Sequence, residues 1–259
     1  MRAARLFLAT ATLSAGLAAP WEALSQTFPA ARVDDPTSRA QAVVERVRTK
    51  IAVLKIKRPG TTASATGFLA SPRLVVTAAH ALDDAESFRV WMNGVAFRPQ
   101  TVALHPEHDV ASVRLAAREL HLKPAELAAT SSDLINGEEL RIVAGPSQPR
   151  NADADPARRV IIPAQLAGRV ELVGRAGART SALALHASVN RGDSGSPVVR
   201  LRDGKVIGVL CSRELPDNTG VSRVAYAVPV ELLQPWLARL EPRRGDQRAD
   251  EEFYLLPRR

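Results

Sequence analysis

The sequence predicts an all-β fold of antiparallel barrels followed by one C-terminal helix. The first observation is a series of short apolar or alternating runs separated by turn residues, a pattern typical of antiparallel barrels. The second is a pair of hairpin turns, Asn93-Gly94 and Asp203-Gly204, each lying between two such runs. The third is loop 145–158, rich in proline, alanine, aspartate and arginine, which divides the runs into two halves. With 46% apolar and 24% charged residues, the chain has the composition of an ordinary globular protein.

The first half is preceded by an N-terminal extension, residues 26–50, which we expect to end in a short helix. Asp35-Pro36 interrupts the chain, and from residue 40 to residue 50 apolar side chains recur at roughly helical spacing. Beyond this helix the spacing changes to that of strands. The strand-like runs of the first half are residues 51–57, 66–70, 73–78, 87–92, 95–104, 109–115 and 139–144.

The second half repeats the strand pattern and ends in a helix. Its strand-like runs are residues 159–173, 181–187, 197–202, 205–211 and 222–228. Val230, Leu233 and Leu237 then recur at helical spacing, with Trp236 beside them, which predicts a terminal helix lying on the second barrel. Residues 241–259 form a charged C-terminal tail, which we expect to be frayed rather than a docking motif.

The N-terminus has the features of a signal peptide. The first five residues include two arginines, and residues 6–19 are apolar over a length too short to span a bilayer. We therefore expect residues 1–25 to be a signal peptide cleaved after Ser25. Cleavage in the Ala18-Ala19 region and an uncleaved anchor are the alternatives. The predicted location is outside the cytoplasm, either periplasmic or secreted.

The charge and cysteine content limit the partners and the means of stabilisation. The formal net charge is +8, but aromatic residues make up only 4% of the chain and are not interleaved with the arginines, so the pattern does not favour nucleic-acid binding. The single cysteine, Cys211, excludes an intramolecular disulfide, so stability must come from the core. We expect Cys211 itself to be a small buried strand residue.

The run Gly192-Asp193-Ser194-Gly195 is the clearest chemical motif in the chain. Two glycines near one hydroxyl allow the backbone to turn tightly and to point N–H groups toward the place of a substrate carbonyl. A serine hydroxyl is a poor nucleophile by itself, because it needs a base within hydrogen-bond reach and a third group that orients the base. The motif therefore predicts a nucleophilic serine and requires both partners elsewhere in the sequence.

Both partners are present upstream. The apolar run at 73–78 ends in small residues and then presents His80, which places an imidazole at the end of a strand. Asp109 opens the run at 109–115, from which its carboxylate could accept the imidazole N–H and hold its tautomer. The other histidines show no recognisable metal-ligand spacing, so neither a metal nor another cofactor is expected.

His80, Asp109 and Ser194, in this order and with these neighbours, resemble the chymotrypsin-like (trypsin-like) serine proteases. The matching fragments are Thr-Ala-Ala-His, Asp-Val-Ala and Gly-Asp-Ser-Gly-Ser-Pro, and the resemblance covers the expected domain, residues 51–240. An α/β-hydrolase is disfavoured because its Gly-x-Ser-x-Gly motif needs a glycine where this chain has Ser196.

The resemblance implies a fold and an evolutionary branch. It implies two six-stranded antiparallel β-barrels, at about 51–145 and 159–228, with the terminal helix on the second. Ala81 stands where many animal relatives carry a cysteine, which favours the disulfide-free bacterial branch, including the Deg type. We expect no peptide-binding (PDZ) domain after residue 240. No Ile-Val-Gly-Gly precedes the histidine, so activation by a new N-terminus is not expected.

The resemblance also implies an oxyanion hole and a specificity pocket. The backbone N–H groups of Gly192 and Ser194 would hold the oxyanion. Counting back from the nucleophile as in the family places Ser188 at the pocket base, where tryptic enzymes carry an acid, so cleavage after lysine or arginine is disfavoured. A narrow pocket for small apolar residues is expected instead. Its remaining lining residues are expected to be Cys211, Ser212, Arg213 and Val224.

The sequence thus predicts an exported serine endopeptidase that acts on polypeptides. The alternative from another class is a catalytically inactive protein- or peptide-binding module on the same scaffold. The three intact site residues argue against that alternative. The sequence leaves the oligomeric state open.

Overall fold

The computed structural model describes residues 36–116, 122–145, 160–213 and 222–241. The predicted signal peptide, the start of the N-terminal extension, loop 146–158 and the tail beyond residue 241 lie outside these ranges. The described part contains thirteen strands, two α-helices and two short 3₁₀ turns. None of its helices is both long enough and apolar enough to cross a membrane.

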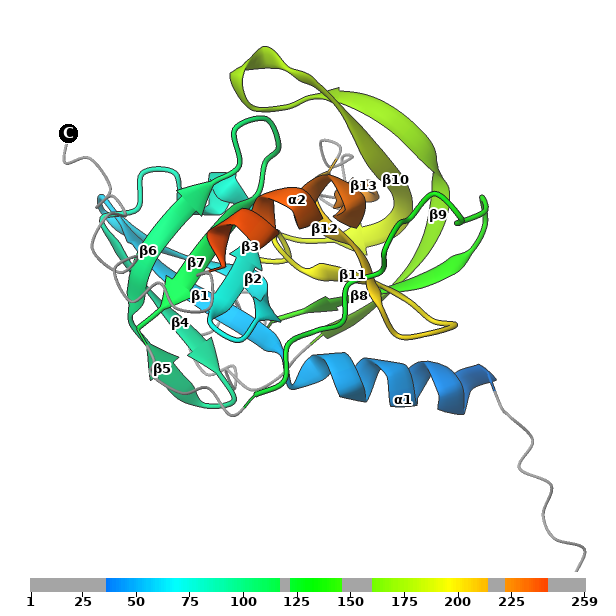
Figure 1. Ribbon diagram of the computed structural model, residues 1–259, viewed down its shortest axis with the longest axis horizontal. Helices are drawn as coiled ribbons and strands as arrows, with labels where there is room; N and C mark the ends of the chain where they lie inside the picture. Colours follow the sequence, from blue (N-terminus) through cyan, green and yellow to red (C-terminus); the bar gives the residue numbers. More distant parts are fainter. Residues whose placement is uncertain (1–35, 117–121, 146–159, 214–221, 242–259) are drawn as a thin grey trace, which may run out of the picture. The chain divides into compact units, whose positions relative to one another are not determined.

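The first half of the described chain is a single seven-stranded sheet (Figure 1). Its strands are β1 Ile51–Arg58, β2 Thr61–Ser71, β3 Leu74–Thr77, β4 Ser87–Met92, β5 Val95–Phe97, β6 Pro99–Leu104 and β7 Ala111–Leu115. They pair in the order β5-β4-β1-β2-β3-β7-β6. The turn Asn93-Gly94 joins β4 to β5 with φ values of 47° and 82°, and two positive φ values suit a type I′ hairpin.

The two edges of this sheet belong to one stretch of chain. The sequence predicts a single strand at 95–104, but the structure divides it into β5, which pairs with β4, and β6, which pairs with β7. Pro99 starts β6 and has no N–H for a ladder, which accounts for the break after Phe97. Counted as one bent strand, β5 and β6 reduce the sheet to six runs, but the sheet is not closed, so the first of the two predicted barrels is a half-barrel.

The second half is a closed six-stranded barrel with the order β10-β13-β12-β11-β8-β9. The run at 139–144, which the sequence assigns to the first barrel, is β8 of this second barrel, because it pairs with β9 and β11. Its strands are β8 Glu139–Ala144, β9 Val160–Val173, β10 Arg179–Val189, β11 Pro197–Arg200, β12 Val206–Arg213 and β13 Ser222–Pro229. The chymotrypsin-like arrangement of a C-terminal helix on the second barrel is confirmed. Helix α2, Val230–Leu240, packs on β12 and β13 (Figure 1).

Three clusters of buried residues hold these parts together. One fills the first sheet around Leu54, Leu69 and Val90, and another fills the second barrel around Leu140 and Leu183. The third lies between the halves and joins both helices to them. It contains Val43, Val44 and Val47 of α1, Pro36–Arg48, and Leu233, Trp236 and Leu237 of α2. The chain therefore needs no disulfide to hold its two halves together.

Candidate active site

His80 lies just beyond the end of a fully buried strand. All four residues of β3 are buried, and the chain then turns through the 3₁₀ segment Ala79–Leu82. Ala79 and Ala81 are buried on either side of His80, whose side chain keeps 44% of its surface exposed. The local sequence thus anchors the turn by its small residues and leaves the imidazole accessible.

Asp109 lies beside His80 and holds it through two hydrogen bonds. The Nδ1 of His80 and the Oδ2 of Asp109 are 2.6 Å apart, and the backbone N–H of His80 donates to Oδ1 at 2.8 Å. A carboxylate is an acceptor, so Nδ1 carries the proton and Nε2 is left as the basic nitrogen. The hydrogen bond to Asp109 raises the pKa of His80, although burial opposes the shift.

Ser194 lies on the other side of the imidazole. The Oγ of Ser194 is 3.1 Å from Nε2 of His80, within the range for proton transfer from the hydroxyl to the ring. The serine comes from the loop between β10 and β11, whereas His80 and Asp109 come from the first half. The structure therefore brings together all three predicted residues in one line of hydrogen bonds. This line can deprotonate the hydroxyl and stabilise the imidazolium that results.

Gly195 fixes the shape of the loop that carries Ser194. Its φ is +87°, and a Cβ there would lie 2.1 Å from the carbonyl oxygen of Thr66 and 2.4 Å from Oγ1 of Thr77. Gly192 also has a positive φ, of 100°. The buried Asp193 accepts the N–H of Asn190 through Oδ2 at 2.6 Å. Glycine is required at 195 both for the backbone conformation and for the close approach of the first half.

Thr66 of β2 clamps the same loop, and sequence reasoning missed it. Its side chain is 1% exposed, and its Oγ1 donates to the carbonyl of Gly192 at 2.8 Å while accepting the N–H of Gly145 at 2.9 Å. Its backbone N–H donates to the carbonyl of Ser194 at 3.0 Å. Thr77, inside the motif that precedes His80, donates to the carbonyl of Thr66 at 2.6 Å. Thr66 thus joins the two halves directly behind the reactive serine.

A cavity of about 350 Å³ opens beside the three residues. It is lined by His80, Asp109, Val189, Asn190, Arg191, Ser194, Leu210, Cys211 and Ser212. Cys211 and Ser212 are thus among the lining residues, and their role in specificity stays a prediction. Ser188 is exposed near the end of β10 and Val224 is half-buried on β13, and neither is among the described lining residues. Arg213 is the last residue of β12, and the pocket role of these three residues stays a prediction.

Cys211 contributes a protonated thiol to the cavity wall. The residue is 5% exposed, its Sγ donates to the carbonyl of Tyr226 at 3.4 Å, and burial raises its pKa to about 12. A thiol with such a pKa is unreactive at neutral pH because the thiolate is the nucleophile. Within the described ranges, no group of three or more histidine, cysteine or acidic residues could hold a metal ion.

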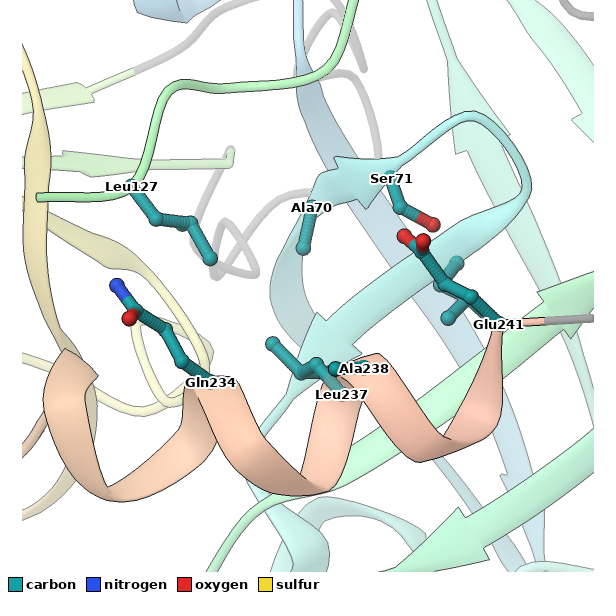
Figure 2. A pocket seen from close by; sticks show the side chains of 8 residues that line it. Ala70, Ser71, Leu127, Gln234, Leu237, Ala238 and Glu241 are labelled. Atoms are coloured by element: carbon teal, nitrogen blue, oxygen red, sulfur yellow. The ribbon is translucent and has the colours of Figure 1, made fainter. Parts of the chain in front are cut away.

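A second hollow lies beside α2 and contains none of the three reactive residues. Its volume is about 190 Å³, and Figure 2 shows Leu127 and Leu237 on opposite sides of it. Gln234 of α2 donates its side-chain N–H to the carbonyl of Ala128, which fixes the helix against the loop that follows residue 122. This hollow is mainly apolar, and none of the three reactive residues lines it. The candidate active site is therefore the cavity beside Ser194.

Comparison with known proteins identifies the same fold and family. Residues 65–209 match the profile of the family described as the trypsin-like peptidase domain. Serine protease Rv3671c of Mycobacterium tuberculosis is 30% identical over 173 residues, which cover 64% of this chain and 41% of the relative. Serine protease MT3772 of the same species matches equally well. The chain thus spans about two fifths of the length of the curated relatives it matches.

Solved structures with low sequence identity share the fold. The Rv3671c protease from M. tuberculosis in its active form has a TM-score of 0.67 at 21% identity, covering 81% of this chain and 88% of that chain. The HtrA-type protease AlgW with a tripeptide has a TM-score of 0.63 at 16% identity, covering 78% of this chain and 63% of that chain. The two-halved architecture is therefore common to all three proteins.

Proposed function

The chain belongs to the trypsin-like peptidase domain family, and we propose from this premise that it is an exported serine endopeptidase. The observation that carries the proposal is the line of hydrogen bonds from Asp109 through His80 to Ser194, with separations of 2.6 and 3.1 Å. These separations fit a nucleophile, its general base and the group that orients the base.

In the proposed reaction, Ser194 Oγ attacks the carbonyl carbon of a peptide bond while His80 Nε2 takes the hydroxyl proton. His80 then gives that proton to the leaving amine, and an acyl-enzyme remains on Ser194. A water molecule hydrolyses the ester in a second step, again with His80 as the base. Asp109 stays ionised and stabilises the imidazolium in both steps.

The oxyanion of each tetrahedral intermediate would be held by the backbone N–H groups of Gly192 and Ser194. The hydrogen bonds of the loop support this assignment. The neighbouring N–H groups are already used inside the protein. That of Asp193 donates to the carbonyl of Asn190 at 3.2 Å, and that of Gly195 donates to the carbonyl of Leu210 at 2.7 Å. A single oxyanion donor is typically worth about 10² to 10³ in turnover.

We propose that the substrates are polypeptides cleaved after small, uncharged residues. Val189, Leu210 and Cys211 form the apolar part of a cavity whose other lining residues are polar or charged, and the predicted pocket base, Ser188, carries no charge. A library of peptides that differ at the residue before the cleaved bond tests this preference. Preferential cleavage after lysine or arginine would contradict it.

The proposed domain organisation has a signal peptide at 1–25, an extension at 26–50, a protease domain at 51–240 and a charged tail at 241–259. The protein would then be periplasmic or secreted. Ile51 is fully buried and pairs with Phe68, which supports a site that forms without cleavage at this position. Sequencing the N-terminus of the exported protein tests both proposals. An active form that begins at Ile51 would contradict the second.

A fluorophosphonate probe tests the enzymatic activity directly. We expect the probe to label the wild-type protein and to leave Ser194→Ala unlabelled, and we expect only the wild type to hydrolyse unfolded casein. Ser87→Ala is a matched control, because it removes an exposed hydroxyl of β4 outside the cavity and should keep the label. Absence of labelling in a correctly folded wild type would favour the binding module over the enzyme.

A further inference from the structure

The turn that carries Asp109 is organised around one imidazole ring. At its ends, the backbone N–H of His105 donates to the carbonyl of Val110 at 2.9 Å, and that of Val110 donates to the carbonyl of His108 at 2.8 Å. Inside the turn, Nδ1 of His105 accepts the backbone N–H groups of Glu107 at 3.2 Å and of His108 at 3.1 Å. A backbone N–H can only donate, so this Nδ1 has no proton and the ring is the neutral Nε2–H tautomer.

The surroundings of the ring keep it in this state. His105 is 7% exposed, stacks on His108 with ring centroids 4.4 Å apart and 28° between the ring planes, and makes an edge contact with Trp236 of α2 at 5.1 Å. Burial lowers the pKa of His105 to about 4, and the nearby His108 and Arg239 act in the same direction against the opposing carboxylate of Glu107. The imidazole is therefore uncharged wherever His80 is a working base.

The same turn connects His105 to both sides of the active site. The carbonyl of Asp109 accepts the N–H of Ala79 at 3.3 Å, next to His80. On the outer side, the carbonyl of Glu107 accepts the N–H of Arg175 from the second half at 2.8 Å. A change in the path of residues 105–108 would therefore move the Asp109 carboxylate relative to the His80 ring.

We infer that His105 is a positioning residue for Asp109, which acts by accepting two backbone N–H groups and thereby fixing the turn that aims the carboxylate at His80. The inference rests on the proposed function of Ser194, His80 and Asp109. It assigns His105 no contact with substrate and no proton transfer. Small errors in alignment matter here, because a displacement of about 1 Å can cost about 10²-fold in rate.

Two substitutions at His105 distinguish the role of the Nδ1 acceptor from the role of the aromatic ring. His105→Phe keeps an aromatic ring against Trp236 but has no acceptor, whereas His105→Asn offers a side-chain oxygen that can accept the N–H groups two and three residues onward, as in an Asx turn. We expect His105→Phe to lower kcat by about 10- to 100-fold with little change in KM. We expect His105→Asn to stay within about threefold of the wild type.

His108→Phe is the matched control. His108 is 6% exposed and stacks on His105 itself, and its buried Nδ1 has no hydrogen-bond partner among the described residues. Replacing this ring by phenylalanine should therefore leave the turn and the rate close to those of the wild type. A loss in His108→Phe equal to that in His105→Phe would mean that ring shape matters rather than the acceptor, and would overturn the inference.

A second readout does not depend on proteolytic activity. In a Ser194→Ala background, the NMR titration of His80 should give a pKa above 6.5 in the parent, because Asp109 stabilises the imidazolium. We expect this pKa to fall toward 6.5 in His105→Phe and to stay unchanged in His105→Asn and His108→Phe. An unchanged pKa and rate in folded His105→Phe would overturn the inference.

The two readouts also separate the inference from the proposed function. If the wild type shows no protease activity, the His80 titration in these variants still decides whether His105 positions Asp109. If His105→Phe does not fold while His108→Phe does, His105→Asn carries the decision. A wild-type pKa and rate in His105→Asn would support the inference, and a loss of more than about tenfold there would overturn it.

Discussion

The two halves of the active site are held in different ways. On the base side, His80 and Asp109 lie next to the strands β3 and β7 of one sheet, only 29 residues apart, and most of the hydrogen bonds that align them lie within residues 79–110. On the nucleophile side, the loop around Ser194 has local hydrogen bonds of its own, but it is also held by Thr66, which bonds to Gly192 across a separation of 126 residues. The hydrogen bonds between His80 and Asp109 thus lie within one half, whereas the nucleophile loop is held in addition by a residue of the other half.

The largest effect should come from breaking the base side at Asp109. Asp109→Asn keeps the size of the side chain but replaces one acceptor oxygen by a donor amide, which no longer holds Nδ1–H of His80. We expect kcat/KM to fall about 10⁴-fold with the fold intact, as measured by steady-state kinetics and circular dichroism. A loss below about tenfold would contradict the role of the aspartate.

The next largest effect should come from the nucleophile side at Gly195. Gly195→Ala would place a Cβ 2.1 Å from the carbonyl oxygen of Thr66, so the loop must move away from the first half. We expect an activity loss of about 10³-fold or more and no labelling of Ser194 by a fluorophosphonate. Gly60→Ala is the control, because φ is +68° there but nothing lies within 4 Å of the added Cβ. This control should cost about 1–2 kcal/mol of stability and leave the rate unchanged.

Thr66→Val tests the connection between the halves without a steric clash. Valine has nearly the same shape but leaves the carbonyl of Gly192 and the N–H of Gly145 without their buried partner, at a cost of about 1–3 kcal/mol. We expect kcat to fall about 10- to 100-fold, because Thr66 no longer holds the loop that carries Ser194 in place. Thr66→Ser restores the hydroxyl and should recover most of the rate. Equal losses in both variants would show that packing, not the hydroxyl, is what counts.

The smallest effect is on the pH at which the rate is half-maximal. This midpoint best distinguishes the base side from the nucleophile side. The base must be neutral to act, and its pKa is raised above 6.5, so kcat/KM should fall as the pH decreases through a midpoint above 6.5. Thr66→Val should lower the rate at every pH and leave this midpoint in place. Asp109→Asn should move the midpoint to lower pH, because the hydrogen bond that raises the pKa is lost. Rate profiles between pH 5 and 9 measure both. A shifted midpoint in Thr66→Val would show that the two sides are not independent.

The contrast between the sides also explains what the sequence could reveal. His80, Asp109 and Ser194 are recognisable because each lies in a short motif. The neighbouring residues in these motifs are required by the local structure, as glycine is required by the positive φ at position 195. Thr66 has no such signature. It lies in a run of small and hydroxyl residues in which nothing distinguishes it from Thr61 or Thr62, and its role arises only when β2 passes the nucleophile loop.

The strands follow the same rule. The runs at 87–92 and 139–144 were predictable to the residue, because apolar residues recur along them and their ends are marked by turns. The start of β2 at Thr61 was missed, since residues 61–65 are small and polar and owe their extended form to pairing with β1. The division of 95–104 at Arg98 depends on two partner strands on opposite edges, which no local pattern contains.

The single cysteine, Cys211, can report when the second barrel opens, because its thiol reacts only when it is exposed. The thiol of Cys211 is buried in the wall of the cavity with a pKa of about 12, so a thiol-specific dye at pH 8 finds almost no thiolate in the folded state. In the unfolded chain the same thiol would return to its ordinary pKa and react. The labelling rate of unmodified protein therefore measures how often the second barrel opens. Because the chain has one cysteine, that rate reports on a single position without any engineering.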